Sequence, residues 1–352
     1  MAIYAIWNNK GGVGKSYLSF QIACEYARQN PDKKVLVVDM CPQANASSML
    51  LGGMIDGEER LNEIHAQVRR NTISGYLEDR IASPYQSPST GSTYLTQVHA
   101  FNPRVPQNLF LVAGDEQLET QASRVSNATR PGPPDAWRTV HLWIADLIDD
   151  ILTSWNHQES AVFIDCNPSF SVYTELALSA AERLLIPFSA DGSSKRAVRA
   201  VLSLVYGVRR QQTDPLSEFV INTRQARMRT PEIYMYIGNR LTQMNNSSAS
   251  AFKTVVDEIG DEIWNVWQMR ANAFCIHPTA AATPTSKRSF KAMFQYEVND
   301  ANTASVVSGA LGIPISVLAA GRAVVAGKSI TVNQSQLDKQ VPNVQSLVQS
   351  IE

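Results

Sequence analysis

The sequence predicts an α/β fold with a doubly wound, mostly parallel sheet, in one domain that spans residues 1–352. Three continuous apolar runs, at 3–7, 35–39 and 161–165, have the length of strands that are buried on both faces. The first run leads directly into a glycine-rich segment and a helix, and the other two end in an aspartate. Ligands of such sheets bind at the carboxyl ends of the strands, so these three ends predict the place of the functional site.

The bulk composition is that of a globular protein and excludes several classes of function. Hydrophobic residues make up 44% of the chain and charged residues 18%, and the formal net charge is −1. A chain without overall basicity needs a local patch to bind nucleic acid. The cysteines have no C-x-x-C spacing and the histidines are scattered, so no zinc or iron–sulfur site is predicted. No basic leader precedes the first strand and no long apolar run follows, so we expect a cytoplasmic protein.

The glycine-rich segment after the first strand predicts a loop that binds nucleotide phosphates. Its glycines allow backbone N–H groups to close on an anion, and a helix starts directly after it. We expect Lys15 to neutralise phosphate charge and the Ser16 hydroxyl to coordinate Mg²⁺. The expected nucleotide contacts are Gly11, Gly12, Val13, Gly14, Lys15, Ser16 and Tyr17.

The sequence of this phosphate-binding loop (P-loop) differs from the general pattern G-x-x-x-x-G-K-[ST]. Asn9 stands where the pattern has glycine, and an additional lysine, Lys10, precedes Gly11. The string Lys-Gly-Gly-Val-Gly-Lys-Ser resembles the deviant Walker A motif of the ParA/MinD family of partition and positioning ATPases. The resemblance implies that the nucleotide is ATP. It also implies that Lys10 is a catalytic residue, like Lys15, and reaches the nucleotide of a partner subunit in an ATP sandwich dimer.

The residues after the second strand resemble a second motif of this family, Asp-x-Asp-Pro-Gln-x-Asn-x-[Ser/Thr]. Asp39, Pro42, Gln43 and Asn45 match it, but Cys41 stands in place of the second aspartate. In the family, that aspartate lies close to the attacking water. A neutral thiol is a poor hydrogen-bond acceptor for water. We therefore expect nucleotide binding, with Asp39 at the catalytic site, but slow hydrolysis.

The third strand end resembles the Walker B and switch region of the family. Asp165 is expected to hold Mg²⁺ through water, together with Ser16, and to be the fourth catalytic residue. Asp39 and Asp165 are 126 residues apart. This long separation favours one elaborated P-loop domain, with insertions at about 53–108 and 240–305.

Further strands are predicted at 109–112, 184–187, 219–222 and 329–332, and helices at 17–29, 73–81, 137–155 and 195–210 and near the C-terminus. The run at 219–222 ends in Asn222. In the family an asparagine at this strand end reads the adenine, so the resemblance implies that Asn222 contacts the base.

A basic region between residues 195 and 240 suggests a second ligand. It contains nine Lys or Arg residues against three acids, which suits phosphate contacts without base reading, although a solvated surface is the alternative. The resemblance implies that the ATP-bound dimer binds DNA nonspecifically in this part of the chain. The candidate contacts are Lys195, Arg196, Arg199, Arg210, Arg227 and Arg229.

The resemblance to the ParA/MinD family implies a ParA-like, nucleoid-associated ATPase that partitions a plasmid, a chromosome region or another cargo with a ParB-like partner. The final helix has Lys339 as its only base, so we expect it to dock on the core rather than on a membrane. Two alternatives stay open. One is an ATP-dependent DNA-binding switch or filament scaffold with little hydrolysis, and the other is a metabolic enzyme with the same deviant Walker A loop.

Overall fold

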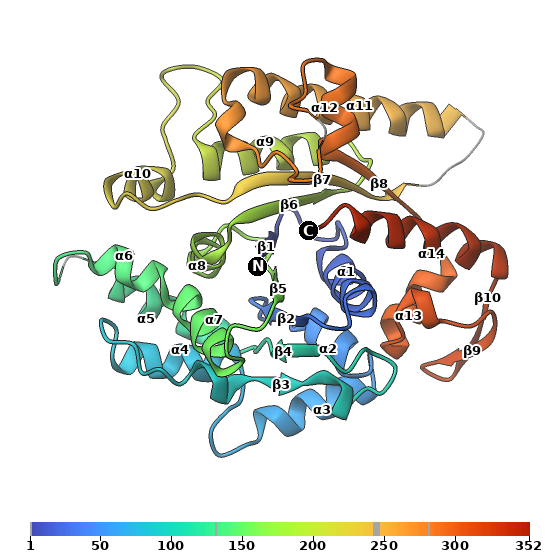
Figure 1. Ribbon diagram of the computed structural model, residues 1–352, viewed down its shortest axis with the longest axis horizontal. Coiled ribbons are helices and arrows are strands. Elements are labelled where there is room, and N and C mark those ends of the chain that lie inside the picture. Colours follow the sequence, from blue (N-terminus) through green and yellow to red (C-terminus); the bar gives the residue numbers. More distant parts are fainter. Residues whose placement is uncertain (1, 131, 242–246, 281) are drawn as a thin grey trace.

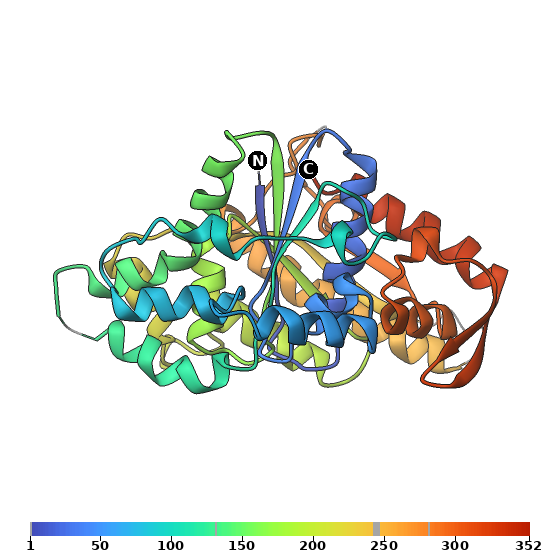
Figure 2. The same ribbon diagram turned by 90° about the horizontal axis from the view of Figure 1, so that it is seen from below.

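The computed structural model describes residues 2–130, 132–241, 247–280 and 282–352. Helices flank a central eight-stranded sheet on both faces (Figures 1 and 2). Its strands, from one edge to the other, are β3 (Thr96–Gln97), β4 (Leu109–Val112), β2 (Lys34–Asp39), β5 (Ser160–Asp165), β1 (Ala2–Ile6), β6 (Arg183–Phe188), β7 (Glu232–Leu241) and β8 (Gln295–Asn299). All neighbouring strands are parallel except β3 and β4. The predicted doubly wound, mostly parallel fold is confirmed.

The helices divide between the two faces of this sheet. One face packs against α4 (Ile73–Ala82), α5 (Leu118–Ala128), α6 (Ala136–His141), α7 (Trp143–Ser154), α8 (Val172–Ala180), α9 (Ser194–Tyr206), α10 (Glu218–Gln225), α11 (Ser247–Met269) and α12 (Lys287–Phe294). The other face packs against α1 (Lys15–Gln29), α2 (Asn45–Leu51), α3 (Asp56–His65) and α14 (Gln334–Gln349). Short 3₁₀ turns lie at Gly91–Tyr94, Val98–Ala100, Ala271–Ala273 and Ile315–Val317.

A smaller third core lies beside α14. It joins α13 (Thr303–Leu311) to an antiparallel hairpin of β9 (Gly321–Val325) and β10 (Lys328–Val332). Leu347 and Val348 of α14 are buried in the core of the main sheet, so the predicted docking of the final helix is confirmed. In the part of the chain that the structure describes, no helix combines the length and hydrophobicity of a membrane span.

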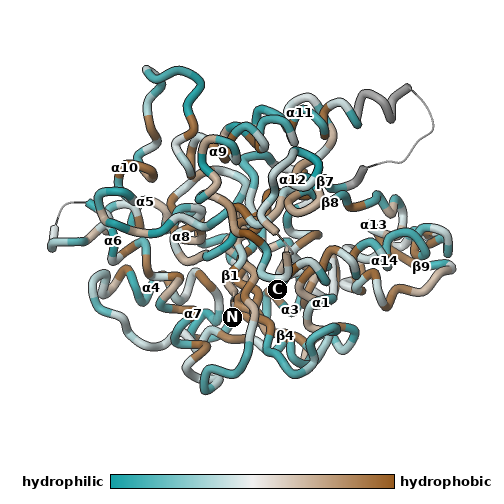
Figure 3. Tube along the Cα trace, turned by 45° about the horizontal axis from the view of Figure 1, so that its top comes forward, coloured by the Kyte–Doolittle hydropathy of each residue, from teal (hydrophilic) through white to brown (hydrophobic). Residues whose placement is uncertain are grey.

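The alternation of side chains along the central strands explains the continuous apolar runs. Ile3 and Ala5 of β1 belong to the core on one face, whereas Tyr4 and Ile6 belong to the core on the other. Successive side chains of a strand point to opposite faces, so burial of both faces requires every position to be apolar. Figure 3 shows these hydrophobic strands at the centre of the molecule.

The strand predicted at 219–222 is wrong, because this segment forms helix α10. Ser217 caps the helix, with its hydroxyl oxygen accepting a hydrogen bond from the Val220 N–H at 3.2 Å. The strand next to β6 is instead β7, which starts at Glu232. Asn222 therefore lies in a helix and not at a strand end.

The two segments expected as insertions each contribute a strand to the edge of the main sheet. The segment 53–108 provides β3, and the segment 240–305 provides β8. Residues 242–246 of the second segment lie outside the described residues. The helix predicted at 195–210 ends earlier, at Tyr206, because Gly207 adopts a left-handed conformation with a φ of +66°.

Candidate functional site

The glycine-rich loop connects β1 to α1 at the carboxyl edge of the sheet. Gly12 and Gly14 have φ angles of +76° and +81°, in the left-handed region that other residues rarely adopt. The Lys15 ammonium group donates to the carbonyl oxygens of Lys10, at 2.7 Å, and Asn8, at 3.3 Å. Burial lowers the pKa of Lys15, and the nearby Asp165 carboxylate acts in the opposite direction. The lysine thus lies across a loop whose backbone is curved to receive an anion.

A cavity of about 800 Å³ opens over this loop. The loop contributes Gly11, Gly12, Gly14, Lys15, Ser16 and Tyr17 to the lining, which also includes Cys41 after β2 and Cys166 after β5. Helix α13 forms the opposite wall with Ser305 and Val306. The volume is within the range of pockets that hold cofactors and small molecules. Val13 is buried beneath the loop and does not line the cavity.

The carboxylate of Asp165 is buried at the end of β5, with 1% of the residue exposed. Its Oδ1 accepts a hydrogen bond from the Ser19 hydroxyl at 2.8 Å, and its Oδ2 has no partner among the described residues. Burial and the neighbouring Asp39 raise the pKa of Asp165, whereas the nearby hydroxyl groups of Ser16 and Ser19 act in the opposite direction. A buried, unpartnered carboxylate oxygen beside serine hydroxyls is the oxygen donor set that Mg²⁺ prefers. These residues therefore fit a magnesium ion.

Asp39 is the register partner of Asp165 on the neighbouring strand, but its carboxylate has different contacts. One oxygen accepts the Cys41 N–H at 3.0 Å, and the other accepts the N–H and hydroxyl of Ser47 at 3.0 and 2.7 Å. The Ser47 hydroxyl oxygen in turn accepts the Gly114 N–H at 2.9 Å. Both oxygens of Asp39 thus hold the loop that follows β2, and this geometry supports a positioning role.

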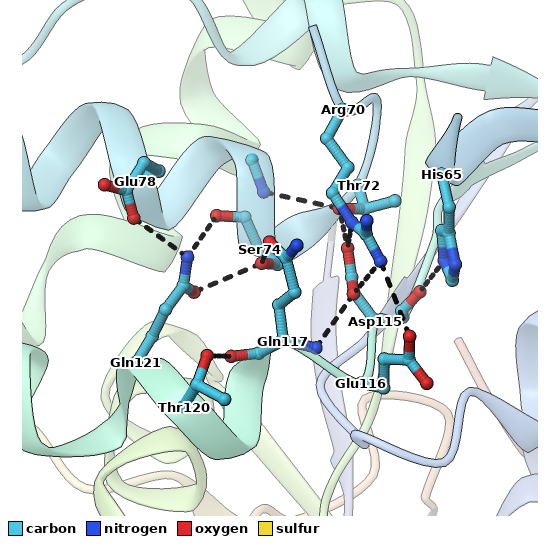
Figure 4. A network of polar contacts seen from close by, with 12 residues as sticks. His65, Arg70, Thr72, Ser74, Glu78, Asp115, Glu116, Gln117, Thr120 and Gln121 are labelled. Atoms are coloured by element: carbon cyan, nitrogen blue, oxygen red, sulfur yellow. Dashed lines mark hydrogen bonds and ion pairs between the residues drawn. The ribbon is translucent and has the colours of Figure 1, made fainter. Parts of the chain in front are cut away.

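A third buried carboxylate, Asp115, holds the neighbouring strand end in place (Figure 4). Arg70 forms a two-pronged ion pair with it, and the Thr72 hydroxyl donates to it at 2.6 Å. His65 contacts the Gly114 carbonyl oxygen at 3.3 Å. These contacts tie the segment 53–108 to the loop that Asp39 organises.

Cys41 lines the cavity as a neutral thiol. The residue is 5% exposed. Burial and the carboxylates of Asp39 and Asp165 raise the pKa of Cys41 to about 12. A thiol that stays protonated at neutral pH cannot accept a proton from water as a carboxylate could.

Lys10 does not point into the cavity but contacts residues of its own subunit. Its ammonium group forms an ion pair with Asp191 and lies 3.2 Å from the Ser189 hydroxyl and 3.3 Å from the Ser194 hydroxyl. The predicted contact with a partner's nucleotide would require Lys10 to leave this position.

The strand expected next to β6, with an asparagine near its carboxyl end, is β7. Its asparagine is Asn239 and not Asn222. Asn239 lies near the end of β7 and is buried, and its side-chain amide donates to the Val13 carbonyl oxygen at 2.9 Å. It therefore braces the P-loop from the side. The sequence contained its signal, an apolar run that ends in asparagine, but we assigned the same pattern to the segment 219–222.

The predicted DNA-contact residues differ in their ionic surroundings. Helix α11 supplies acids to α9, so Lys195 pairs with Glu258 at 2.9 Å and Arg199 pairs with Glu262. The other four candidates are exposed and form no ion pair among the described residues: Arg196, Arg210, Arg227 and Arg229. Arg196 lies near the start of α9 and Arg210 beyond its end, so about 15 Å of helix lies between them. The basic region is continuous in sequence but divided in space.

Sequence reasoning did not single out several residues that hold the site together. Ser19 is three positions after Ser16 and therefore lies on the same face of α1, a helical spacing that could have identified it. Asp191 and Asn8 follow no pattern that we used. Their roles arise from the meeting of the loop after β1 with the end of β6, where Asn8 donates to the Pro187 carbonyl oxygen at 2.7 Å.

Comparisons with known proteins agree with this geometry. A family model described as an AAA domain matches residues 1–217. The chain is 27% identical over 192 residues to an uncharacterised protein of Pseudomonas putida, a match that covers 54% of this chain and 56% of that protein. It is 24% identical over 189 residues to the chromosome partitioning protein ParA of Myxococcus xanthus, covering 54% and 52%. The chain thus spans about half the length of the curated relatives it matches.

Two solved structures share the fold at low sequence identity. A complex of a Cyanothece McdA variant with ATP has a TM-score of 0.59 and 14% identity, covering 100% of this chain and 97% of that chain. The structure of pNOB8 ParA has a TM-score of 0.50 and 15% identity, covering 84% and 80%. At these identities the likeness establishes the architecture alone.

Proposed function

The chain belongs to the AAA domain family, as a ParA/MinD-like P-loop ATPase, and from this premise we propose that it is an ATP-dependent partition protein that binds DNA nonspecifically. It would position a plasmid, a chromosome region or another cargo on the nucleoid, with a ParB-like protein as its partner. The ParA relative of Myxococcus xanthus carries out chromosome partitioning, which supports this class of function.

The observation that carries the proposal is the combination of the P-loop with Asp165. The loop offers curved backbone and the Lys15 ammonium group to the phosphates of ATP, and the unpartnered Asp165 Oδ2 lies at the adjacent strand end. Bound Mg²⁺ would neutralise phosphate charge, with Ser16 and Asp165 as the residues that hold it. Catalysis would then rest on positioning and charge neutralisation by this chain's own lysines.

Dimerisation on ATP binding is the second part of the proposal. Lys10 would exchange the Asp191 carboxylate for the phosphates of the nucleotide in the partner subunit. The exchange is energetically accessible because 46% of the Asp191 side chain is exposed, and exposed ion pairs contribute about 0–1 kcal/mol.

DNA binding by the dimer would rely first on the exposed arginines that form no ion pair within the described part of the chain, among them Arg227 and Arg229. Lys195 and Arg199 would contribute less, because the acids of α11 already neutralise them. Contacts of this kind neutralise phosphates without reading sequence.

One observation favours a second candidate, an ATP-dependent DNA-binding switch or filament scaffold with little hydrolysis. Cys41 places a neutral thiol where the family's motif has a carboxylate. Because a general base contributes about 10²- to 10⁴-fold to a proton-transfer step, its loss would leave a slow ATPase or a switch that releases nucleotide intact.

A metabolic enzyme with the same loop is the third class. One set of measurements separates the three. We expect the purified chain to bind ATP with Mg²⁺ and to form dimers that light scattering detects. We also expect a column that carries a random-sequence DNA duplex to retain the protein only when ATP is present. ATP turnover with and without DNA then distinguishes a slow ATPase from a switch. Binding of ATP without any ATP-dependent DNA retention would contradict the partition proposal and favour the metabolic class.

A further inference from the structure

A second polar cavity lies near the amino ends of the strands, whereas the P-loop lies at their carboxyl ends. Its volume is about 360 Å³. It is formed where the end of α9, helix α10 and the turn after α11 meet beside the start of β7. In Figure 1, α9 and α11 lie above β7, and α10 lies to their left. The cavity is therefore separate from the nucleotide site.

The charged residues that line this cavity are both arginines. Arg224 comes from α10 and Arg270 follows α11, and no acid is part of the lining. Within the described ranges neither arginine forms an ion pair, in contrast to the neutralised bases Lys195 and Arg199 on the same layer. Two guanidinium groups that share a cavity without a counter-charge favour the binding of an anion.

The orientation of Arg270 is fixed by the protein. Its Nη1 donates to the Tyr206 carbonyl oxygen, and the Tyr206 hydroxyl donates to the Pro231 carbonyl oxygen at 2.7 Å. This anchoring uses one of the five N–H donors of the guanidinium group and leaves the others for a ligand. A preorganised arginine loses little conformational freedom when an anion binds.

Thr223 gives independent evidence for a built site. The residue lines the cavity and is 3% exposed, and its hydroxyl has no hydrogen-bond partner in the part of the chain that the structure describes. A threonine in a helix usually bonds to a carbonyl oxygen one turn earlier, and a buried polar atom without a partner is uncommon. Thr223 thus brings a buried hydroxyl that needs a hydrogen-bond partner to the wall of the cavity, and Asn272 is also part of the lining.

We propose that this cavity binds a phosphate group through Arg224, Arg270 and Thr223. Guanidinium forks match the geometry of phosphate oxygens, and hydroxyl and amide donors complete the shell. The remaining wall includes Met228, so an organic group attached to the phosphate would find apolar contacts. The phosphate belongs either to a small phosphate ester or to the backbone of DNA, in which case the site extends the proposed DNA-binding function.

Calorimetric titration with phenyl phosphate tests the site, with an excess of a non-hydrolysable ATP analogue and Mg²⁺ present so that the P-loop is occupied and the protein is in its proposed DNA-binding state. We expect the double variant R224Q/R270Q to bind phenyl phosphate about tenfold more weakly or worse, because it loses two charge-assisted contacts. T223V has nearly the same shape and should weaken binding several-fold. The pair R322Q/K328Q, on the exposed β9–β10 hairpin, removes the same charge and should bind as the wild type does.

Addition of duplex DNA identifies the source of the phosphate. Displacement of phenyl phosphate by DNA, with weaker DNA retention by R224Q/R270Q than by R322Q/K328Q, would assign the site to the DNA backbone. Phenyl phosphate that stays bound in the presence of DNA would assign it to a small ester. Normal ATP binding by R224Q/R270Q shows that the fold and the nucleotide site are intact. The proposal is overturned if R224Q/R270Q matches R322Q/K328Q in both the titration and the DNA assay.

Discussion

The Lys10 ammonium group forms an ion pair with the Asp191 carboxylate of its own chain, at the end of β6. In the proposed dimer, the same lysine of the deviant Walker A motif would contact the nucleotide of the partner subunit. One side chain cannot occupy both positions. In the proposed dimer the ion pair would therefore oppose dimerisation, and its strength would set part of the free energy that ATP binding must supply.

The first prediction concerns this ion pair. Asp191→Asn should allow ATP-dependent dimerisation at a lower protein concentration, because Lys10 no longer leaves a charged partner. The gain should be no more than about fivefold, since surface ion pairs contribute about 0–1 kcal/mol. Light scattering over a concentration series at saturating ATP measures it.

The controls for this prediction separate the two roles of Lys10. Asp32→Asn removes an exposed carboxylate elsewhere and should leave dimerisation unchanged. Lys10→Ala should weaken dimerisation much more than ATP binding. Normal dimers of Lys10→Ala would refute the role of Lys10 in the partner's site.

The second prediction concerns the thiol at the end of β2. Cys41→Asp restores the carboxylate of the family's motif and should raise ATP turnover by roughly 10- to 100-fold, because a carboxylate can accept a hydrogen bond from the attacking water. Steady-state phosphate release in the presence of DNA measures the effect.

Cys41→Ser is the matched control, because it replaces the sulfur atom by oxygen without adding charge. ATP turnover by this variant should stay close to that of the wild type. Unchanged turnover in Cys41→Asp would show that another group orients the water. Normal ATP binding by both variants is needed for this comparison.

The third prediction concerns the unpartnered oxygen of Asp165. Asp165→Asn should abolish the Mg²⁺ dependence of ATP binding, because the amide replaces the charged ligand. It should also stabilise the nucleotide-free protein by about 0.5–2 kcal/mol, since it removes a buried charge beside Asp39. Fluorescent-nucleotide titration and denaturant unfolding measure the two effects.

Asp149→Asn, on the exposed side of α7, should change neither quantity. If Asp165→Asn binds ATP with the Mg²⁺ dependence of the wild type, the metal is held by other residues.

The fourth prediction is a loss of stability in acid that depends on His277. Burial lowers the pKa of His277, although the Tyr234 carbonyl oxygen and Glu352 act in the opposite direction. A histidine whose pKa is lowered by folding binds its proton more readily in the unfolded chain. Its contribution to stability is therefore complete above the ordinary histidine pKa, about 6.5, and decreases as the pH falls below it.

His277→Phe keeps an aromatic ring against Tyr234, with which the imidazole stacks at 4.1 Å. The variant should lose less thermal stability than the wild type between pH 7.5 and 5.5. Circular dichroism melting curves measure this difference, and an equal decline in both proteins would exclude His277 as the origin of the acid sensitivity.

The sequence could predict those parts of the fold and site that depend on local patterns. The two-sided burial of β1, β2 and β5 requires continuous apolar runs, and the curvature of the P-loop requires glycines at Gly12 and Gly14. Each of these requirements is visible within a few residues.

Features that depend on tertiary neighbours could not be predicted. The acids that neutralise Lys195 and Arg199 are 63 residues away in sequence, on α11. The apolar run at 219–222 is the same length as a strand, and only Ser217 indicated that a helix starts there. Periodicity cannot distinguish a short buried helix from a short buried strand, and here the helix cap was the better evidence.

The fifth prediction concerns the ion pairs between α9 and α11. Replacement of both Glu258 and Glu262 by glutamine should free Lys195 and Arg199 and strengthen DNA binding by the ATP-bound protein. The dependence on salt should also become steeper, by up to about 0.9 in logarithmic slope for each additional phosphate contact. Fluorescence anisotropy with a labelled random duplex, between 50 and 200 mM salt, measures both quantities.

The same helix offers a matched control with the same change in net charge. Asp257 pairs with Lys291, and Asp261 pairs with Lys287, so D257N/D261N frees two lysines of α12 instead. If the surface of α9 faces DNA, E258Q/E262Q gains affinity and D257N/D261N gains much less. Equal gains in DNA affinity would mean that binding depends only on the overall charge of the protein. That result would exclude α9 from the DNA-binding surface.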